Sequence, residues 1–361
     1  MVSVARLIKE MPKGYEQACF DEKAIVRKRG IENPDDLMML SLFHLLNGCS
    51  LTEVSTIAEL TKLGKVSDVA FMNRFENCNN WFLWITSNIT TNGAISYSKP
   101  KWLENYNVSG IDATDVREKG RSGRLYRLHF ALDIFKMKSL QYNITTNETG
   151  ESLRNFEIKE NDLYLADRGY ISLNGIEHCI NGGGSFVLRL RKNSFKLYDS
   201  NDKEINLLEH LKNIESDNAL DFIVYAKGSN GKKIPLKVCA KRKTAEAIEN
   251  TQKKLRRREQ KNQAKMADDT KSFNEYIVLL TNLPEDIMSE GILELYRYRW
   301  QIEIYFKRLK SIMDFGQLPK RRPASVMAWL NGKLMIALLI EKIVGTVVFS
   351  PDGEFQKEHM A

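Results

Sequence analysis

The pattern of apolar and polar positions divides the chain into a helical stretch, a strand-rich stretch and a second helical stretch. Residues 1–98 place apolar side chains at helical spacing, and short polar residues and glycines interrupt them where helices are expected to begin and end. The expected caps and breaks are Asn33, Ser50, Ser67, Gly48 and Gly64. Short helices around a glycine turn are typical of helix-turn-helix DNA-binding units, although a plain helical bundle explains the pattern equally well.

Strands are expected between residues 99 and 193. The stretch "NVSGIDATDV" predicts a short strand that runs into a loop, and "LYRLHFALDIFKMKSLQYNITT" predicts a two-strand hairpin broken near "FKMK". "DLYLA" predicts a further strand, "SLNGIEHCINGGG" a short helix with a glycine stop, and "SFVLRLRKN" another strand. This succession predicts a mixed α/β core.

A second strand-rich stretch covers residues 194–282, and a helical pattern covers 283 to about 345. Inside the strand-rich stretch, residues 241–271 are polar and carry eleven Lys or Arg against five Asp or Glu. This segment is expected to be helical or mobile. Its charge fits a solvated helix face or an arm that contacts nucleic acid.

The composition sets broader limits. A chain of 361 residues is expected to form two or three domains, or one large core with an insertion. The formal net charge of +8 and the pI of about 9.0 favour an anionic partner, most commonly nucleic acid. The five scattered cysteines contain no CxxC pair, which predicts free thiols in a reducing cytosol and no zinc site.

No membrane association is expected. The N-terminal residues lack the apolar run and the cleavage site of a signal peptide. The most apolar stretch, "LMIALLI" at 334–340, is short and lies between Lys333 and Glu341. It predicts a buried helix rather than a membrane span, so a cytosolic protein is expected.

Two aspartates occupy positions where catalytic acids are expected. Asp112 and Asp167 each follow a short apolar run, and such acids at the ends of adjacent strands, joined by one acid from a helix, can hold divalent cations. Two Mg²⁺ ions held in this way support phosphodiester cleavage. Any one of these acids, like Asp115 and Asp133 nearby, is also explained by a turn, a cap or an ion pair.

The third acid is expected in "YRYRWQIEIYFKRLK", residues 296–310. On a continuous helix, Tyr296, Arg299, Glu303 and Lys310 share a face about 60° wide. An apolar arc able to pack on the core is formed by Ile302, Phe306 and Leu309, with Tyr305 apart from both groups. The alternative is an ordinary ion-paired face, with Glu303 between Arg299 and Lys307.

These residues carry a family resemblance. The helix matches Y-x2-R-x3-E-x6-K, a signature of bacterial insertion-sequence transposases of the insertion-sequence-four type. "GIDATDV" and "ADRGY" resemble the motifs of that family's first and second acids, with Ala113 where Gly or Thr is more common. "RLYRLHFALDIF" and "GESLRNF" resemble the segments between the two acids, and the resemblance spans about residues 40–340.

The resemblance implies an RNase H-like core interrupted by a β-rich insertion, with Asp112, Asp167 and Glu303 as the metal-binding catalytic triad. It implies two Mg²⁺ ions, replaceable by Mn²⁺. It also implies that the DNA-binding residues are Tyr296, Arg299 and Lys310, with Arg168 as a weaker candidate and Trp300 stacking on a displaced base or packing in the core. The implied partners are transposon terminal repeats, target DNA and a second copy of the chain.

The expected organisation is a helical DNA-binding domain at 1–98, the two core parts at 99–193 and 283–361, and the insertion at 194–282. The expected function is metal-dependent cleavage at transposon ends followed by strand transfer. Two alternatives stay open. The short stretch after the last helix allows a truncated or inactive copy that binds ends as a regulator. The sequence also does not distinguish a transposase from an RNase H-like nuclease that cuts without joining. The terminal repeat sequence, the target preference and the use of a hairpin pathway are not readable from the sequence.

Overall fold

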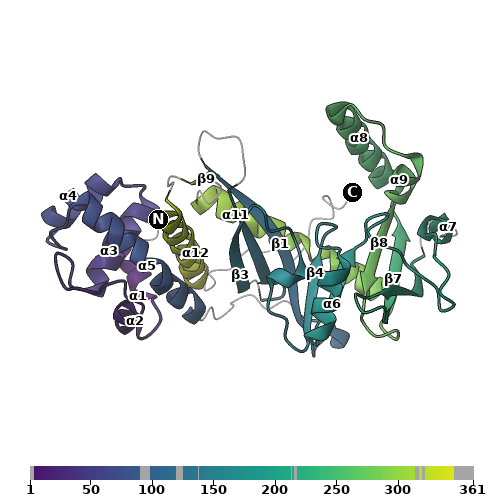
Figure 1. The fold of residues 1–361 in the computed structure, drawn as a ribbon, viewed down its shortest axis with the longest axis horizontal. Coiled ribbons are helices and arrows are strands. Elements are labelled where there is room, and N and C mark those ends of the chain that lie inside the picture. Colours follow the sequence, from purple (N-terminus) through teal and green to yellow (C-terminus); the bar gives the residue numbers. More distant parts are fainter. Residues whose placement is uncertain are drawn as a thin grey trace.

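The computed structural model shows an elongated molecule with helices α1–α5 at one end, a sheet through the middle, and strands β6–β8 at the other end (Figure 1). The structure describes residues 4–89, 98–118, 125–136, 138–212, 214, 218–313, 317–318 and 322–344. The last expected segment, 345–361, lies outside the described residues.

The described residues of the N-terminal end form helices α1–α5, and the sequence predicted where α3, α4 and α5 begin. The helices are α1 (Val4–Lys9), α2 (Tyr15–Asp21), α3 (Pro34–Leu46), α4 (Leu51–Leu60) and α5 (Asp68–Asn88). The three predicted N-caps are confirmed: the side chains of Asn33, Ser50 and Ser67 accept backbone N–H groups of the first turns. The helix-turn-helix interpretation stays a prediction.

One mixed sheet runs through the rest of the chain, as the predicted α/β class requires. Its strands are β1 (Asn107–Glu118), β2 (Tyr126–Asp133), β3 (Lys138–Thr146), β4 (Asp162–Ala166), β5 (Ser185–Arg189), β6 (Leu220–Lys227), β7 (Lys233–Arg242), β8 (Tyr276–Thr281) and β9 (Gln317–Leu318). Their order is β3-β2-β1-β4-β5-β8-β7-β6, and β9 pairs with β1. Strands β1, β4 and β5 are parallel neighbours, and the strands on either side of them are antiparallel.

The strand-rich stretch after residue 194 extends this same sheet, because β8 pairs with β5. Its helices are α7 (Leu207–Lys212), α8 (Ala245–Asn262) and α9 (Asp268–Phe273), while α6 (Leu173–Asn181) lies between β4 and β5. Helix α8 contains most of the predicted basic segment, and it projects from the strands (Figure 1). Helix formation in this segment is confirmed.

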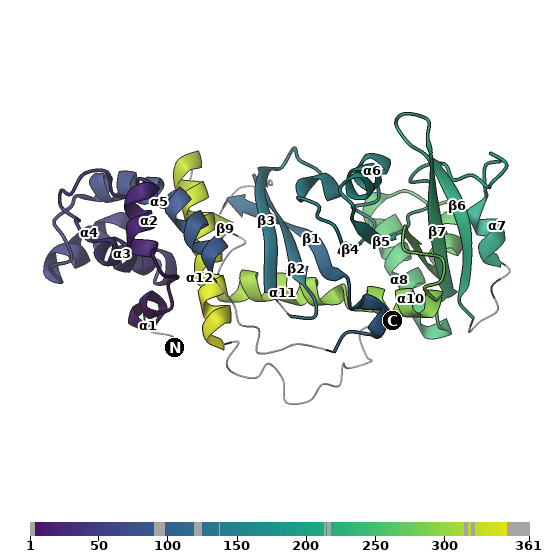
Figure 2. The same ribbon diagram turned by 90° about the horizontal axis from the view of Figure 1, so that it is seen from below.

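Helix α12 (Pro323–Val344) joins the N-terminal helices to the sheet. It lies between α5 and the strands (Figure 2). Its residues Pro323–Ile343 are long and apolar enough to cross a membrane, but 78% of the apolar window is buried inside the molecule. The prediction of a buried helix around 334–340 is therefore confirmed.

Helices α10 (Ser289–Arg297) and α11 (Trp300–Met313) correct the expected single helix over 296–310. At the junction, the N–H groups of Tyr298, Arg299, Gln301 and Ile302 donate to carbonyls three residues earlier. These tighter 3₁₀-type bonds replace the α-helical pattern and interrupt it between the two helices. A single helical wheel therefore does not describe the positions of Tyr296 and Glu303 relative to each other.

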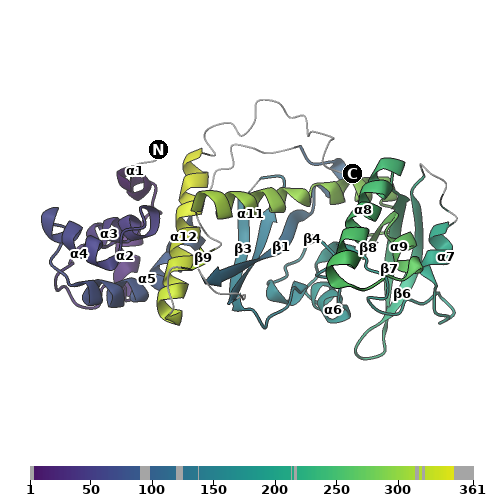
Figure 3. The ribbon, with the colours of Figure 1, turned by 90° about the horizontal axis from the view of Figure 1, so that it is seen from above.

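Helix α11 runs along the sheet (Figure 3) and packs through an apolar face. Ile302 and Phe306 are buried as predicted. Tyr305, which the helical wheel placed apart from them, is also buried, since its ring stacks on Phe130 of β2 with centroids 4.8 Å apart. Contacts with β2 and with Glu341 of α12 therefore bury a broader arc of α11 than the wheel assigned to the core.

Candidate active site

Asp112 lies inside a strand, which corrects the prediction that it ends one. Strand β1 continues beyond Asp112 because its antiparallel pairing with β2 persists to Val116, with Asp112 opposite Phe130, and its last two residues pair with β9. The parallel pairing with β4 ends earlier, at Gly110 opposite Leu165. Asp112 therefore lies just beyond the point where β1 is no longer paired with β4. The end of β4, rather than the end of β1, leaves one side of the strand unpaired at this aspartate.

Asp167 directly follows β4, as predicted. It lies two residues beyond Leu165, just as Asp112 lies two residues beyond Gly110, so the two aspartates occupy equivalent positions on adjacent parallel strands. The N–H of Gly169 donates to Asp167 Oδ1 at 2.7 Å, which fixes one carboxylate oxygen in the turn. The two aspartates interact electrostatically.

The environment of Asp112 disfavours its negative charge. Burial and the charges of Asp167 and Glu151, partly offset by the N–H of Ala113 and the charge of Arg299, together raise the pKa of this carboxyl to about 7. The distance from the Ala113 nitrogen to Asp112 Oδ1 is 2.8 Å. A further positive charge at this position would favour the ionised carboxylate.

Glu151 is a third carboxylate in this region that the sequence analysis assigned no role. A Cβ placed on Gly169 would lie 1.9 Å from Glu151 Oε2 and 3.1 Å from Asp167 Oδ1. The missing side chain of Gly169 is therefore what lets Glu151 approach Asp167. The only signal for Glu151 in the sequence was its position in "GESLRNF". Its contact with the turn that begins sixteen residues later, at Asp167, forms only in the folded chain.

Arg299 connects the aspartates to Glu303. Its Nη2 donates to Glu303 Oε1 at 2.6 Å, and its guanidinium interacts electrostatically with both Asp112 and Asp167. Burial opposes the charge of Arg299, yet its pKa is raised because Tyr296, Glu303 and Asp167 outweigh the burial. The ion pair expected under the alternative interpretation is thus present, and it lies beside the two aspartates.

The remaining DNA-binding candidates lie around this pair. Tyr296, at the end of α10, is 8% exposed, and the Arg299 guanidinium lies 5.8 Å from its ring centroid. Trp300 is half-buried, with the Lys307 ammonium 6.0 Å from the centre of its ring system. Lys310 is exposed on α11.

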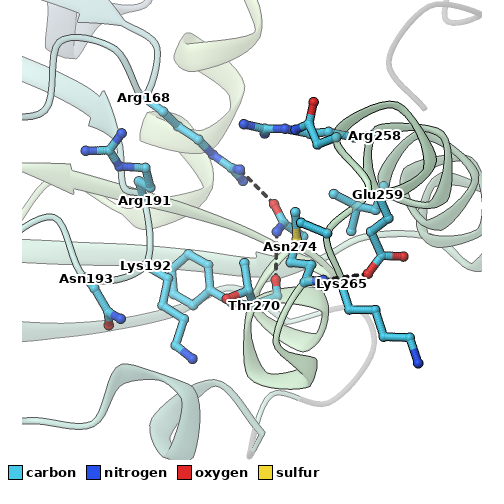
Figure 4. Close-up of a pocket in the computed structure, with 14 residues that line it drawn as sticks. Arg168, Arg191, Lys192, Asn193, Arg258, Glu259, Lys265, Thr270 and Asn274 are labelled. Atoms are coloured by element: carbon cyan, nitrogen blue, oxygen red, sulfur yellow. Dashed lines mark hydrogen bonds between the residues drawn. The ribbon is translucent and has the colours of Figure 1, made fainter.

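Arg168 points away from the carboxylates toward the α8–α9 region. Its Nη1 donates to Asn274 Oδ1 at 2.7 Å (Figure 4). Burial, and to a smaller extent the neighbouring charges of Arg189 and Arg191, lower the pKa of Arg168 to about 10. Among the described residues, no carboxylate forms an ion pair with the Arg168 guanidinium.

Two nearby aspartates have structural roles, as the ordinary interpretation of such residues predicted. Asp115 accepts from Arg127 Nε at 3.1 Å across the β1–β2 pair. Asp133 Oδ1 accepts the N–H groups of Phe135 and Lys136 in the turn after β2. Both aspartate side chains therefore stabilise the β1–β2 pair and the turn that follows β2.

The carboxylates suit a hard cation in type and charge. Asp112, Asp167 and Glu151 supply oxygen atoms, and the raised pKa of Asp112 reflects a local excess of negative charge that a cation would offset. Within the described parts of the chain, no three His, Cys, Asp or Glu side chains stand close enough to hold one ion. Glu303 is paired with Arg299 in this structure.

Comparisons with known proteins match this arrangement to one class. A family model described as a transposase DDE domain matches residues 105–339, well over half of the chain. InsL of insertion sequence element IS186A in Escherichia coli K12 is 25% identical over 343 residues, covering 92% of this chain and 91% of the relative.

Two further relatives are named as transposases. The transposase for IS421 of Escherichia coli is 25% identical over 344 residues, with 92% of this chain and 91% of the relative covered. The transposase for IS1151 of Clostridium perfringens is 29% identical over 206 residues, with 51% and 42% covered. The family match contains both aspartates, Glu303 and the whole sheet.

Proposed function

Because this chain belongs to the transposase DDE domain family, we propose that it cuts DNA at the ends of an insertion-sequence element and joins the freed ends to target DNA. The observation that carries the proposal is the position of Arg299, which bonds Glu303 and interacts with both Asp112 and Asp167. Three acids far apart in the sequence thereby interact with one side chain, the Arg299 guanidinium. Coverage of nine-tenths of a named transposase supports the same function.

We further propose that the chain is of the insertion-sequence-four type with an RNase H-like core. The spacing of Tyr296, Arg299, Glu303 and Lys310 supports the first assignment. The strand order β3-β2-β1-β4-β5, with Asp112 on the central strand β1 and Asp167 directly after its neighbour β4, supports the second. Under this assignment, the strands β6–β8 belong to the insertion between the second acid and Glu303.

Asp112, Asp167 and Glu303 would hold Mg²⁺, or Mn²⁺ in its place, and we expect two ions. Bound there, the ions would activate the attacking oxygen and stabilise the leaving one. Carboxylates are the ligands that such hard cations prefer. The chain's own contribution is to bring the two aspartates into equivalent strand positions and to keep Glu303 within reach.

The proposed reaction has two phosphoryl-transfer steps. In the first, a water oxygen attacks the phosphorus at the element's end, the bond to the 3′ oxygen breaks, and that oxygen takes a proton to become a 3′-OH. In the second, the 3′-OH attacks a target phosphorus, and the target's own 3′ oxygen leaves. Arg299, Tyr296 and Lys310 would position phosphates through charge and hydrogen bonds, as such transfers require.

Other parts of the chain would bind DNA away from the cut. The basic helix α8 and the N-terminal helices would contact the terminal repeats, with Trp300 available to stack on a displaced base. Two chains would act together on two ends. Its substrate places such a protein in the cytosol of a bacterium, in contact with the chromosome.

The test is a joining assay with purified protein, a labelled duplex that carries the element's end, and an unlabelled plasmid as target. The proposal predicts cut 3′ ends and label transferred to the plasmid, both dependent on Mg²⁺. Cut ends without transferred label would make the protein a nuclease. Binding without any cut product, with either Mg²⁺ or Mn²⁺, would make it a regulator of the element and refute the enzymatic proposal.

A further inference from the structure

A cavity of about 400 Å³ lies between the end of the catalytic sheet and the base of the α8 arm. Figure 4 shows its walls: Arg168 after β4, Arg191 after β5, and Arg258 and Lys265 from α8 and the turn that follows it. Asn274, after α9, closes the cavity beside Arg168. Five basic side chains line the cavity, since Lys192 also contributes, against one acid.

The acid of this cavity is already matched. Glu259 accepts the N–H of Met266 at 2.7 Å and pairs with Lys271 at 3.1 Å. Lys192 is matched as well, by Asp269 at 3.2 Å. Within the described parts of the chain, neither Arg191 nor Arg258 has a carboxylate within ion-pair distance. The cavity therefore presents an excess of positive charge.

The innermost arginine lacks an acceptor for one of its donors. Arg168 Nε is buried and has no hydrogen-bond partner among the described residues, and Nη1 reaches only the neutral side chain of Asn274. The buried Nε of Arg189, the next arginine along the sheet, also has no hydrogen-bond partner among the described residues. Buried cationic donors without acceptors are costly, so an anion that accepts from them would be stabilised.

A phosphate group suits these donors best. Guanidinium groups bind phosphate through paired N–H donors, and several converging from different elements fix both position and orientation. A cavity of this volume admits a phosphodiester with its sugar rather than a bare ion alone. Because Arg168 directly follows Asp167, any strand cut beside Asp167 passes close to the cavity.

We propose that this cavity is a second phosphate site, which binds a backbone phosphate of the DNA strand on one side of the phosphate being cut. Helix α8 would close over the strand and hold it against the core through Arg191 and Arg258. This inference rests on the proposed function, because it takes the strand from the same catalytic acids. The base of α8 would thus bind one particular backbone phosphate, in addition to the general electrostatic attraction between α8 and DNA.

The test uses the full chain in EDTA, so that binding is measured apart from cleavage. The altered protein carries Arg191→Ala and Arg258→Ala, both exposed residues, while Arg168 is left in place because it holds Asn274. The matched control carries Arg256→Ala and Arg257→Ala, which remove the same charge from exposed positions of α8 outside the cavity. Thermal unfolding checks that both proteins fold.

Fluorescence anisotropy is measured on duplexes that carry the element's end, each with one backbone phosphate replaced by an uncharged methylphosphonate. In the wild type and the control, one or two replacements near the cut should weaken binding about tenfold. In the cavity variant, those same replacements should have no effect. The proposal is overturned if the replacement profiles of the cavity variant and the control coincide.

The arms separate the possible failures. A duplex of unrelated sequence, scanned in the same way, shows whether the phosphate belongs to the element's end or to target DNA; the proposal requires the profile on the end duplex. If the wild type cuts and joins DNA while both double variants lose affinity equally, only the second site is refuted. If the wild type binds neither duplex, the proposed function and the second site both fall.

Discussion

At the scale of single residues, Lys243 shows most clearly the excess of positive charge beside the site. Burial, together with the charges of Arg189, Arg168 and Lys254, lowers the pKa of its ammonium to about 8. Its Nζ donates to Thr251 Oγ1 at 2.9 Å, a neutral partner. The folded protein thus holds this lysine where its charge is disfavoured.

Replacing Lys243 with methionine should therefore stabilise the protein at neutral pH. Between about pH 10.5 and pH 8 the unfolded chain binds a proton that the folded chain does not, so wild-type stability falls as pH falls through this window. Below pH 8 the cost is constant, on the order of 2 kcal/mol after partial screening. Urea unfolding of both proteins at pH 7.5 and pH 10.5 measures the difference between their free energies of unfolding. An equal difference at the two pH values would show that the charge of Lys243 is not its cause.

Gly169→Ala should damage the catalytic site without unfolding the protein. Its Cβ would lie 1.9 Å from Glu151 Oε2, so the Glu151 carboxylate must move away from Asp167. We expect the cleavage rate in Mg²⁺ to fall about tenfold, because such sites tolerate little displacement of charged groups.

Gly150→Ala is the control for that substitution, since a Cβ at Gly150 meets nothing within 4 Å. It should leave the cleavage rate within about twofold of the wild type, in line with an ordinary exposed substitution. Equal rates for the two variants would remove Glu151 from the account of the site. Glu151→Gln, which keeps the shape and removes the charge, then tests the carboxylate alone.

At the scale of elements, α12 positions the N-terminal helices through a close contact at Gly332. A Cβ there would lie 2.6 Å from Leu45 Cδ1 of α3 and 3.2 Å from Phe82 Cε2 of α5. Asn331, next to it, donates to Asn79 Oδ1 of α5 at 2.7 Å. The contact therefore depends on the absence of a side chain at this one position.

Gly332→Val should reduce the free energy of unfolding by about 1–3 kcal/mol, the usual cost of overpacking a core. Ala324→Val, at an exposed position of the same helix, is the control and should change it by less than about 0.5 kcal/mol. Chemical denaturation followed by tryptophan fluorescence measures both. A Gly332→Val protein as stable as the control would show that α12 and the N-terminal helices are not held at this contact.

Local signals in the sequence sufficed for elements whose boundaries depend on neighbours in the chain. The caps at Asn33, Ser50 and Ser67 and the position of Asp167 after β4 are of this kind. The position of Asp112 inside β1 was missed because the strand is prolonged by its pairing with β2.

Features created by contacts across the chain were beyond reach of the sequence pattern. The contact of Glu151 with the turn at Gly169 needs the folded loop before β4, and the burial of Tyr305 needs its contacts with β2 and α12. The cavity needs β5 and α8 side by side, although 55 residues separate Arg189 from Thr244. The interruption between α10 and α11 has no glycine or proline to announce it.

At the scale of the whole molecule, the elements that we propose to bind DNA lie at both ends of an elongated body. The N-terminal helices occupy one end and α8 the other, with the sheet and α11 between them (Figures 1 and 3). One DNA end laid along this body would contact both. The proposed reaction joins two ends, so we propose that two chains act together.

The complex with end DNA should therefore contain two chains and two duplexes. Sedimentation equilibrium with a duplex carrying the element's end measures its mass, and a complex of one chain with one duplex at saturation would contradict the paired arrangement. An unrelated duplex of the same length is the control. It should give no complex of defined mass, because general electrostatic attraction is weaker and strongly dependent on salt.

The central claim is that Asp112, Asp167 and Glu303 form one metal-dependent site for cutting DNA. The most direct measurement compares cleavage of end DNA by the wild type, Glu303→Gln and Glu294→Gln, in Mg²⁺ and in EDTA. Glu294 is an exposed glutamate of α10 and serves as the matched control. The account predicts cut 3′ ends from the wild type and from Glu294→Gln in Mg²⁺ alone, and at least a hundredfold fewer, about 3 kcal/mol in barrier, from Glu303→Gln. Cleavage by Glu303→Gln at the wild-type rate would show that Glu303 is only the partner of Arg299 in an ordinary ion pair.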